Sequence, residues 1–448
     1  MTPLVPLMLF GWIPFTVILF FTLKPHHAVL CSVIGGCLFL PMRGYDLPGL
    51  PEYTKSTAIA IGLIMGGRLS GHRRAASFRW RLYDFPMILW CLCPIATSLS
   101  NNLGFYDGLS TSFSQVVVWG VPYLAGRVYF DSAEKLRDLC LGIIVGGLLY
   151  LPLCLYEIRM SPQLSINFYG FFPHSFGQMK RYGGFRPIVF MQHGLMVSLW
   201  MAVTTTVAFW LWRSRDVLHL KGIPMGFLVA TLMITTVLCK SVNGWFALAV
   251  GCGCYLFSRR GKARLPLILL LLAIPLYIGL RMTGVVAGHE VESVAAHVVD
   301  AERAGSLAYR LEEEDLFSRR AFERPILGWG GYGRNRIDPV TGKKIRKAID
   351  ALWLIEFGAK GFLGLLSLFV GMLSGPWLVL RNMSNKSKYA HFIGPVPVVL
   401  SLVVILFMID SLLNGMINPV YIVCSGALVS FSVAVRANQE NHQPSAVG

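Results

Sequence analysis

Two arginines stand on either side of a Gly-Gly pair in the segment Arg181-Tyr-Gly-Gly-Phe-Arg186. An arginine side chain is a planar, permanently charged fork that binds phosphate oxygens through two hydrogen bonds. Pro187 follows directly, and proline is favoured at the first position of a helix, where the helix N-terminus adds partial positive charge. This pattern predicts that Arg181 and Arg186 bind an anion. The alternative is that both arginines only anchor an apolar segment at the lipid head groups.

Three more polar side chains interrupt apolar segments. Lys240 lies between two such segments, and an ammonium group at bilayer depth costs about 2.5–3.5 kcal/mol. We therefore expect Lys240 either to snorkel to the membrane boundary or to bind a charged substrate. His193 lies about two turns into the segment that begins at residue 187, and it is either a buried hydrogen-bonding residue or a catalytic one. Asp410 is expected to be a structural counter-ion that pairs with an arginine or lysine of a neighbouring helix.

The longest polar segment, residues 282–350, holds the remaining candidates. It contains Arg310 and a glycine-dense turn from Pro325 to Gly333, whose backbone N–H groups can approach a ligand closely. Asp350 ends the segment, and its carboxylate is suited either to deprotonating a hydroxyl or to capping the helix that follows. No Asp-x-Asp pair occurs in this segment, so we expect no metal there.

Membrane helices must position these side chains. Hydrophobic residues make up 54% of the 448-residue chain and charged residues only 14%, which excludes an ordinary soluble domain of this length. Apolar segments of about 16 to 25 residues recur, long enough for a helix to cross a hydrocarbon core of about 30 Å. The predicted spans are 3–23, 27–42, 54–68, 85–101, 114–130, 137–157, 187–212, 222–240, 242–258, 264–281, 351–380, 391–413 and 418–436. We therefore predict an all-α polytopic membrane protein with about 12–13 transmembrane helices and one large extracytoplasmic loop.

Basic residues set the predicted orientation. Arginines and lysines cluster after the third, seventh, ninth and eleventh predicted spans, and short basic loops stay in the cytoplasm. The formal net charge of +17 is therefore mainly a topology signal, and we expect membrane lipids and no nucleic acid as partners. The chain then divides into N-terminal transmembrane helices (1–281), a large extracytoplasmic loop (282–350), C-terminal transmembrane helices (351–436) and a cytoplasmic tail (437–448). This is the organisation of a multi-pass protein of the cell inner membrane.

The motifs follow one another in a characteristic order. An Arg-x-x-Gly element that starts at Arg181 precedes a span, and a turn containing Ser241 joins the next two. The large loop then carries an arginine and the glycine-dense turn, and Glu356-x-Gly-x-x-Gly361 opens the following span. This order resembles the O-antigen ligase and O-antigen polymerase superfamily of bacterial envelope glycan enzymes. The resemblance covers roughly residues 180–380.

The resemblance implies a metal-independent glycosyl transfer outside the cytoplasm, without a cofactor. The donor would be a glycan on undecaprenyl diphosphate, and the acceptor a hydroxyl of a glycolipid or another glycan. Arg310 and one of Arg181 and Arg186 would bind the diphosphate leaving group. Many ligases have a histidine just before the Glu-x-Gly-x-x-Gly span, whereas this chain reads Arg346-Lys-Ala-Ile-Asp350 there. Asp350 is therefore our candidate for the general base.

Other activities stay open. A repeat-unit polymerase would use the same donor with a second repeat unit as acceptor. A transporter or flippase of lipid-linked glycans belongs to a different class. Transporters tend to have repeated halves with broken spans at matching positions, and the sequence indicates neither. An inactive scaffold for polysaccharide assembly is the third alternative, because the motif histidine is missing.

Overall fold

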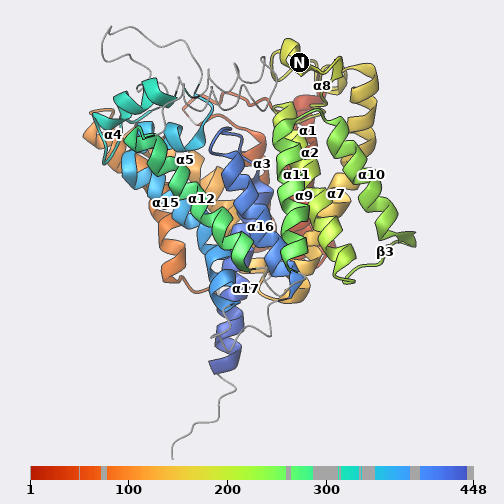
Figure 1. Cartoon of the computed structure of the whole chain (residues 1–448). Helices are drawn as coiled ribbons and strands as arrows, with labels where there is room; N and C mark the ends of the chain where they lie inside the picture. The colour runs from red at the N-terminus through yellow and green to blue at the C-terminus, as the bar shows by residue number, and fades with distance from the viewer. Residues whose placement is uncertain are drawn as a thin grey trace, which may run out of the picture.

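The protein is an all-α polytopic membrane protein (Figure 1). The computed structural model describes residues 2–49, 51–71, 78–258, 264–285, 311, 314–331, 334, 349–383 and 394–440. Within these residues, seven helices are long and apolar enough to cross a membrane, and four shorter apolar helices accompany them. Each predicted span overlaps a helix or, at 114–130, part of a continuous helical run.

The first half of the chain contains α1 (Leu4–Thr22), α2 (Pro25–Phe39), α3 (Lys55–Leu69), η2 (Leu82–Asp84), α4 (Phe85–Ser100), α5 (Phe105–Gln115), the π-helical turn η3 (Val116–Gly120), α6 (Val121–Tyr129), α7 (Ala133–Met160), α8 (Leu164–Tyr169), η4 (Phe176–Met179) and a hairpin of β1 (Lys180–Arg181) and β2 (Gly184–Phe185). The second half contains α9 (Gly194–Arg213), a hairpin of β3 (His219–Leu220) and β4 (Ile223–Pro224), α10 (Met225–Leu238), α11 (Val242–Ser258), α12 (Arg264–Thr283), α15 (Leu352–Asn382), α16 (Pro395–Asp410) and α17 (Pro419–Glu440). Residues 314–322 are also helical.

Local sequence explains where most of these helices begin. An apolar segment in lipid must satisfy its backbone hydrogen bonds internally, so segments of this composition become helices. Pro25 and Pro395 stand at the first positions of α2 and α16, and Ser132 caps α7 by accepting a hydrogen bond from the Lys135 N–H at 3.4 Å. The prediction for α9 was wrong by about two turns. Pro187 does not begin that helix, because residues 187–193 form an irregular segment before Gly194.

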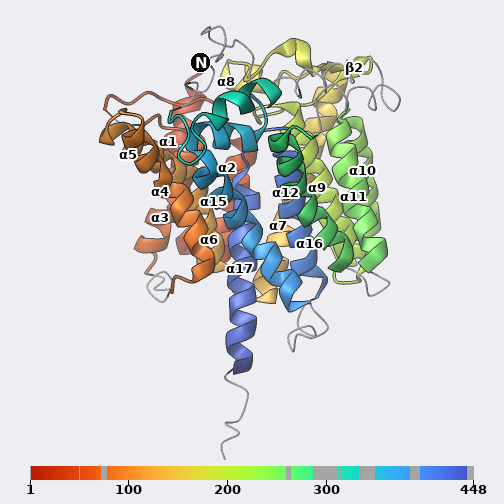
Figure 2. The ribbon, with the colours of Figure 1, turned by 60° about the vertical axis from the view of Figure 1, so that its left-hand side comes forward.

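The bundle has two distinct ends. The N-terminus, α8 and the β1–β2 hairpin lie at one end, the upper end, whereas the β3–β4 hairpin and the last turns of α17 lie at the opposite, lower end (Figures 1 and 2). Because successive helices run in alternating directions, terminal basic residues such as Arg68, Arg213 and Arg381 in the last turns of α3, α9 and α15 share the lower end. The positive-inside rule therefore predicts that the lower end faces the cytoplasm.

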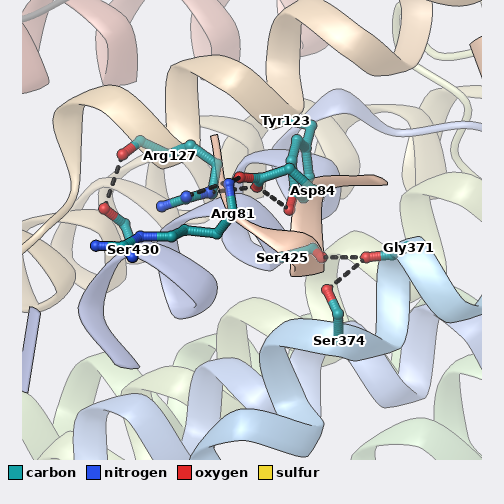
Figure 3. A network of polar contacts seen from close by, with 8 residues as sticks. All are labelled: Arg81, Asp84, Tyr123, Arg127, Gly371, Ser374, Ser425 and Ser430. Atoms are coloured by element: carbon teal, nitrogen blue, oxygen red, sulfur yellow. Dashed lines mark hydrogen bonds and ion pairs between the residues drawn. The ribbon is translucent and has the colours of Figure 1, made fainter. Parts of the chain in front are cut away.

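A buried ion pair joins three elements near the lower end. Asp84 is fully buried, and its carboxylate accepts hydrogen bonds from Arg127 Nε at 2.6 Å, Arg127 Nη2 at 2.9 Å and the Tyr123 hydroxyl at 2.8 Å. Figure 3 shows Arg127 and Tyr123 pointing toward Asp84, with Ser430 of α17 donating to the Arg127 carbonyl at 2.7 Å. Removing one partner from such a pair costs about 3–5 kcal/mol, because the other charge is left buried. We assign this pair a structural role.

Helix α15 is broken at Gly361, which has φ 63° and ψ −160°. Residues 325–330, from the glycine-dense turn, fill the break. Four backbone hydrogen bonds join this turn to the helix: Trp329 N to Gly358 O (2.9 Å), Gly330 N to Ala359 O (2.9 Å), Phe362 N to Pro325 O (2.7 Å) and Leu363 N to Ile326 O (3.2 Å). The sequence predicted one span at 351–380 and did not indicate this break. In lipid, a helix break is tolerated only where other groups satisfy the freed backbone, and this turn does so.

Candidate substrate-binding site

The β1–β2 hairpin presents Arg181 at the upper end of the bundle. Tyr182 and Gly183 connect the strands with φ values of 50° and 65°, the two positive angles of a tight two-residue hairpin turn. The turn therefore uses Tyr182 and Gly183, and the second glycine of the Gly-Gly pair, Gly184, begins β2. Lys180 is exposed whereas Arg181 is partly buried, as expected for neighbours whose side chains point to opposite faces of a strand.

Arg186 and Lys240 come together against this hairpin. The Arg186 backbone N–H donates to the Met179 carbonyl at 2.8 Å, and its Nη2 donates to the Lys240 carbonyl at 3.2 Å. In turn, Lys240 Nζ donates to the Tyr182 carbonyl at 3.2 Å. Arg186 and Lys240, 54 positions apart in the sequence, are thus in direct contact. Arg181 pairs with Gly184 in the same hairpin, and a Cβ atom at Gly184 would lie beside Lys240 Nζ, so we call Arg181, Arg186 and Lys240 the cation cluster. The structure brings together three of the four predicted substrate-binding residues.

Two glycines make room for these cations. A Cβ atom at Gly184 would lie 2.1 Å from Lys240 Nζ, and one at Gly194 would lie 2.2 Å from Arg186 Cδ. Neither distance is compatible with a side chain at its position unless the charged group moves. Lys240 itself has φ 52° in the short turn between α10 and α11, a conformation that non-glycine residues rarely adopt. The backbone is therefore shaped to hold both charged side chains at the start of α9.

A buried carboxylate fixes the irregular segment in front of α9. Glu157, at the end of α7, is fully buried and accepts hydrogen bonds from the backbone N–H groups of Ile188 at 2.8 Å, Val189 at 2.7 Å and Leu164 at 2.9 Å. Sequence reasoning missed Glu157. The available signal was an acidic residue at the end of the predicted span 137–157, because an ionisable group in a span is expensive unless it has a role.

His193 is the N-cap of α9, not a residue two turns inside it. Its Nδ1 accepts from the Leu195 N–H at 3.1 Å, so Nε2 carries the proton in the neutral ring and donates to Gln178 Oε1 at 3.1 Å. The His174 ring packs edge-on against it, with 4.7 Å between ring centroids. With both ring nitrogens hydrogen-bonded, His193 is better suited to positioning α9 and residue 178 than to accepting a proton from a substrate.

Asp350 is exposed and lies just before α15. The N-cap of that helix is Ala351, which makes no side-chain cap, and Asp350 makes no hydrogen bond with any residue that the structure describes. The Asp350 carboxylate therefore does not cap α15. The α15 N-terminus is held instead by the Leu352 N–H, which donates to the Ser411 carbonyl at 3.0 Å.

Asp410 connects the start of α15 to the cation cluster. Its carboxylate accepts hydrogen bonds from two side-chain amides. One belongs to Asn243, at the start of α11, and the other to Asn414, at a distance of 3.0 Å. The sequence did not indicate these amides, and the expected pairing of Asp410 with an arginine or lysine stays a prediction. Since Lys240 precedes α11 and Ser411 follows Asp410, the upper ends of α11, α16 and α15 meet here. Asp350 thus lies at the same end of the bundle as Arg186 and Lys240.

Part of the large loop is anchored over this end. Arg281, at the end of α12, forms ion pairs with Glu314 at 2.8 Å and with Asp315 at 2.9 Å, and the side chains of Arg281 and Glu314 are only 2% and 4% exposed. Burial raises the pKa of Glu314, while Arg281 opposes that shift. The fourth predicted substrate-binding residue, Arg310, lies outside the described residues. Its predicted approach to Arg181 or Arg186 stays a prediction.

A third buried charge pair lies at the break in α15. Glu356 and Lys360 form an ion pair one turn apart, and Lys360 Nζ lies 4.1 Å from the centroid of the Trp90 ring. Gln115 immediately precedes the π-helical turn η3. Its side-chain oxygen accepts a hydrogen bond from Lys360 Nζ at 2.8 Å when the amide is oriented with this oxygen toward the lysine. The motif glutamate of the Glu-x-Gly-x-x-Gly segment is therefore 6% exposed and ion-paired, not directed at the solvent.

The cation cluster is the part of the described structure best suited to an anionic ligand. It combines two guanidinium groups, an ammonium group and the N-terminal end of α9, and it lies at the upper end of the helix bundle. No protein-family profile matches the sequence, and no curated protein matches it. The interpretation of the site therefore depends on its own geometry and on the order of the motifs.

Proposed function

We propose that the protein transfers a glycan from undecaprenyl diphosphate to a hydroxyl acceptor at the upper, extracytoplasmic end of the bundle, in the inner membrane. The observation that supports this most is the convergence of Arg181, Arg186 and Lys240 from two distant segments. A glycan carrier with a diphosphate group brings at least two negative charges to the membrane surface. Several cations that are fixed in advance can neutralise such a group more effectively than one.

The reaction follows from this placement. The acceptor oxygen forms a bond to the anomeric carbon of the glycan, and the bond from that carbon to the diphosphate oxygen breaks. Undecaprenyl diphosphate leaves with the electron pair, and the arginines stabilise the negative charge that develops on it. The hydroxyl proton goes to a general base. Asp350 is our candidate because its carboxylate is exposed at the same end and engages no described partner.

Arg310 completes the proposal as an expectation from the motif order. The acceptor is either a glycolipid, as in a ligase, or a second repeat unit, as in a polymerase. His193 and Gln178 enter as positioning residues, since they hydrogen-bond to each other at 3.1 Å beside the cluster.

One observation favours a second candidate, a transporter or flippase of lipid-linked glycans. The break at Gly361 and the buried Glu356–Lys360 pair are features that transporters use to form sites within the membrane. Such a protein would move the donor across the bilayer without breaking the glycosidic bond.

Reconstitution in liposomes separates these activities. Purified protein is supplied with an undecaprenyl-diphosphate oligosaccharide, alone or with a lipid A core glycolipid, and the products are identified by mass spectrometry. Transfer to the glycolipid indicates a ligase, and doubled oligosaccharide on the carrier indicates a polymerase. An intact donor that becomes accessible to an external glycosidase indicates a flippase. The proposal is wrong if the donor stays intact with every acceptor while Asp350→Asn and wild-type protein behave alike.

A further inference from the structure

His26, His27 and Asp138 converge at the lower end, opposite the cation cluster. His26 and His27 are the second and third residues of α2, and Asp138 lies in the second turn of α7. Both imidazole Nε2 atoms approach the same carboxylate oxygen, Asp138 Oδ2, at 3.0 Å and 3.1 Å. The three candidate ligand atoms all lie within 4.8 Å of one another. Adjacent residues of one helix rarely direct both side chains at one atom, because successive side chains diverge by about 100° around the axis.

The basic residues near Asp138 pair with other carboxylates, which leaves the two histidines as its hydrogen-bond partners. Lys135 forms an ion pair with Asp131, and Arg137 forms one with Asp216 at 2.8 Å. The basic residues nearest to Asp138 in the sequence are thus neutralised by other carboxylates. Within the described residues, Asp138 forms ion pairs with these two histidines and with no lysine or arginine. A neutral imidazole adds no charge, so this carboxylate keeps a net negative charge unless a cation joins the group or a histidine is protonated.

The geometry suits a transition-metal ion. Two imidazoles and one carboxylate are ligands that Zn²⁺ and related divalent ions prefer, and three protein ligands leave a further position for water. At metal–ligand distances of about 2.0–2.1 Å, tetrahedral ligands lie about 3.3 Å apart, so the observed N–O distances need to lengthen by only about 0.3 Å. The side chains are 9% exposed for His26, 23% for Asp138 and 40% for His27, which gives a semi-buried site with access through His27. The buried ring of Phe130 packs edge-on against His26, with 6.3 Å between ring centroids.

We propose that His26, His27 and Asp138 bind one divalent transition-metal ion, with Zn²⁺ as the most suitable, and that this ion links α2 to α7. The site is separate from the cation cluster and does not depend on the proposed glycan transfer. Sequence reasoning did not find it, because the third ligand lies 111 residues after His27. The visible signal was the His-His pair at the start of a membrane helix.

The test uses the full-length protein in detergent, without a histidine tag. The protein is stripped with a chelator and titrated with ZnCl₂, and bound metal is measured by elemental mass spectrometry after gel filtration. We expect one tightly bound Zn²⁺ per chain. Replacing it with Co²⁺ should give the visible absorption bands of a four-coordinate ion. Loss of an outer-shell partner typically weakens metal binding 10–100-fold, so loss of a direct ligand in His26→Ala or Asp138→Asn should weaken it by at least about 100-fold.

His27→Gln provides a milder variant, because His27 is the most exposed of the three ligands. It should keep the fold and lose the Co²⁺ bands. His219→Ala is the matched control, since His219 is an exposed histidine at the same end of the bundle. It should bind Zn²⁺ like the wild type. If wild-type protein retains no Zn²⁺ and shows no Co²⁺ bands, or if His27→Gln and His219→Ala both bind like wild type, the three residues form only a hydrogen-bonded cluster.

Discussion

Replacing Gly361 by alanine tests whether the glycine-dense turn holds the break in α15. The φ of 63° and ψ of −160° fall in a region that is essentially restricted to glycine and costs other residues about 1–3 kcal/mol. An added Cβ would lie 2.4 Å from the carbonyl carbon and oxygen of Ile326 and 2.5 Å from the Pro325 carbonyl oxygen. These are backbone atoms, so the turn itself must move. That movement breaks hydrogen bonds at 2.7 Å and 3.2 Å, each worth about 1 kcal/mol.

We therefore expect Gly361→Ala to weaken the docking of residues 325–330 by about 3–5 kcal/mol in total. Hydrogen exchange on the purified protein measures this directly. The amides of Trp329 and Phe362, which form two of the docking hydrogen bonds, should exchange at least about 100-fold faster than in the wild type.

Gly279→Ala is the matched control. Gly279 lies in α12, and a Cβ atom there would have no neighbour within 4 Å. Alanine is favoured over glycine inside a helix by about 1 kcal/mol, so this variant should be as stable as the wild type or slightly more stable. Equal exchange at Trp329 and Phe362 in Gly361→Ala and in wild-type protein would show that the turn does not fill the break as described.

Three further substitutions test the rest of the upper end. Arg281→Ala leaves the buried Glu314 carboxylate without its ion pair, so it should lower the free energy of unfolding by about 3–5 kcal/mol; an unchanged thermal unfolding curve would contradict the anchoring of the loop. His193→Ala removes the N-cap of α9 and should cost about 1 kcal/mol, whereas His193→Asn should recover most of that loss; equal unfolding of the two variants would argue against capping. Asp350→Asn should lower the rate of glycan transfer by about 10²–10⁴-fold while donor binding stays within twofold, and full activity would exclude Asp350 as the base.

The sequence allowed the helices to be predicted because lipid imposes a simple rule. A segment of about 20 apolar residues has no other way to satisfy its backbone, so composition alone located α1, α7 and α16. The start of α9 was mispredicted because the conformation of residues 187–193 depends on Glu157, which binds their N–H groups from another helix. Local propensity, with proline at position 187, carries no information about that distant carboxylate.

The break in α15 illustrates the same limit. Its first and second halves together look like one long apolar span, and nothing in their composition reveals a break at Gly361. The break exists because residues 325–330 supply hydrogen bonds from outside the helix. The sequence indicated which residues form the cation cluster, but it did not indicate that they contact one another. Arg181, Arg186 and Lys240 were conspicuous because charges are costly at the membrane, but their contact depends on a hairpin and on the α10–α11 turn.

The central claim is that the cation cluster binds the diphosphate of the carrier lipid. The most direct measurement is the affinity of the purified protein for undecaprenyl diphosphate, determined by native mass spectrometry for four single alanine variants. A charge-assisted hydrogen bond is worth about 1.5–3 kcal/mol, so Arg181→Ala, Arg186→Ala and Lys240→Ala should each weaken binding at least about tenfold. Lys180→Ala, which removes the exposed neighbour of Arg181, should bind like the wild type. If all four variants bind undecaprenyl diphosphate as tightly as the wild type, the cluster does not hold the diphosphate and the account of the site is wrong.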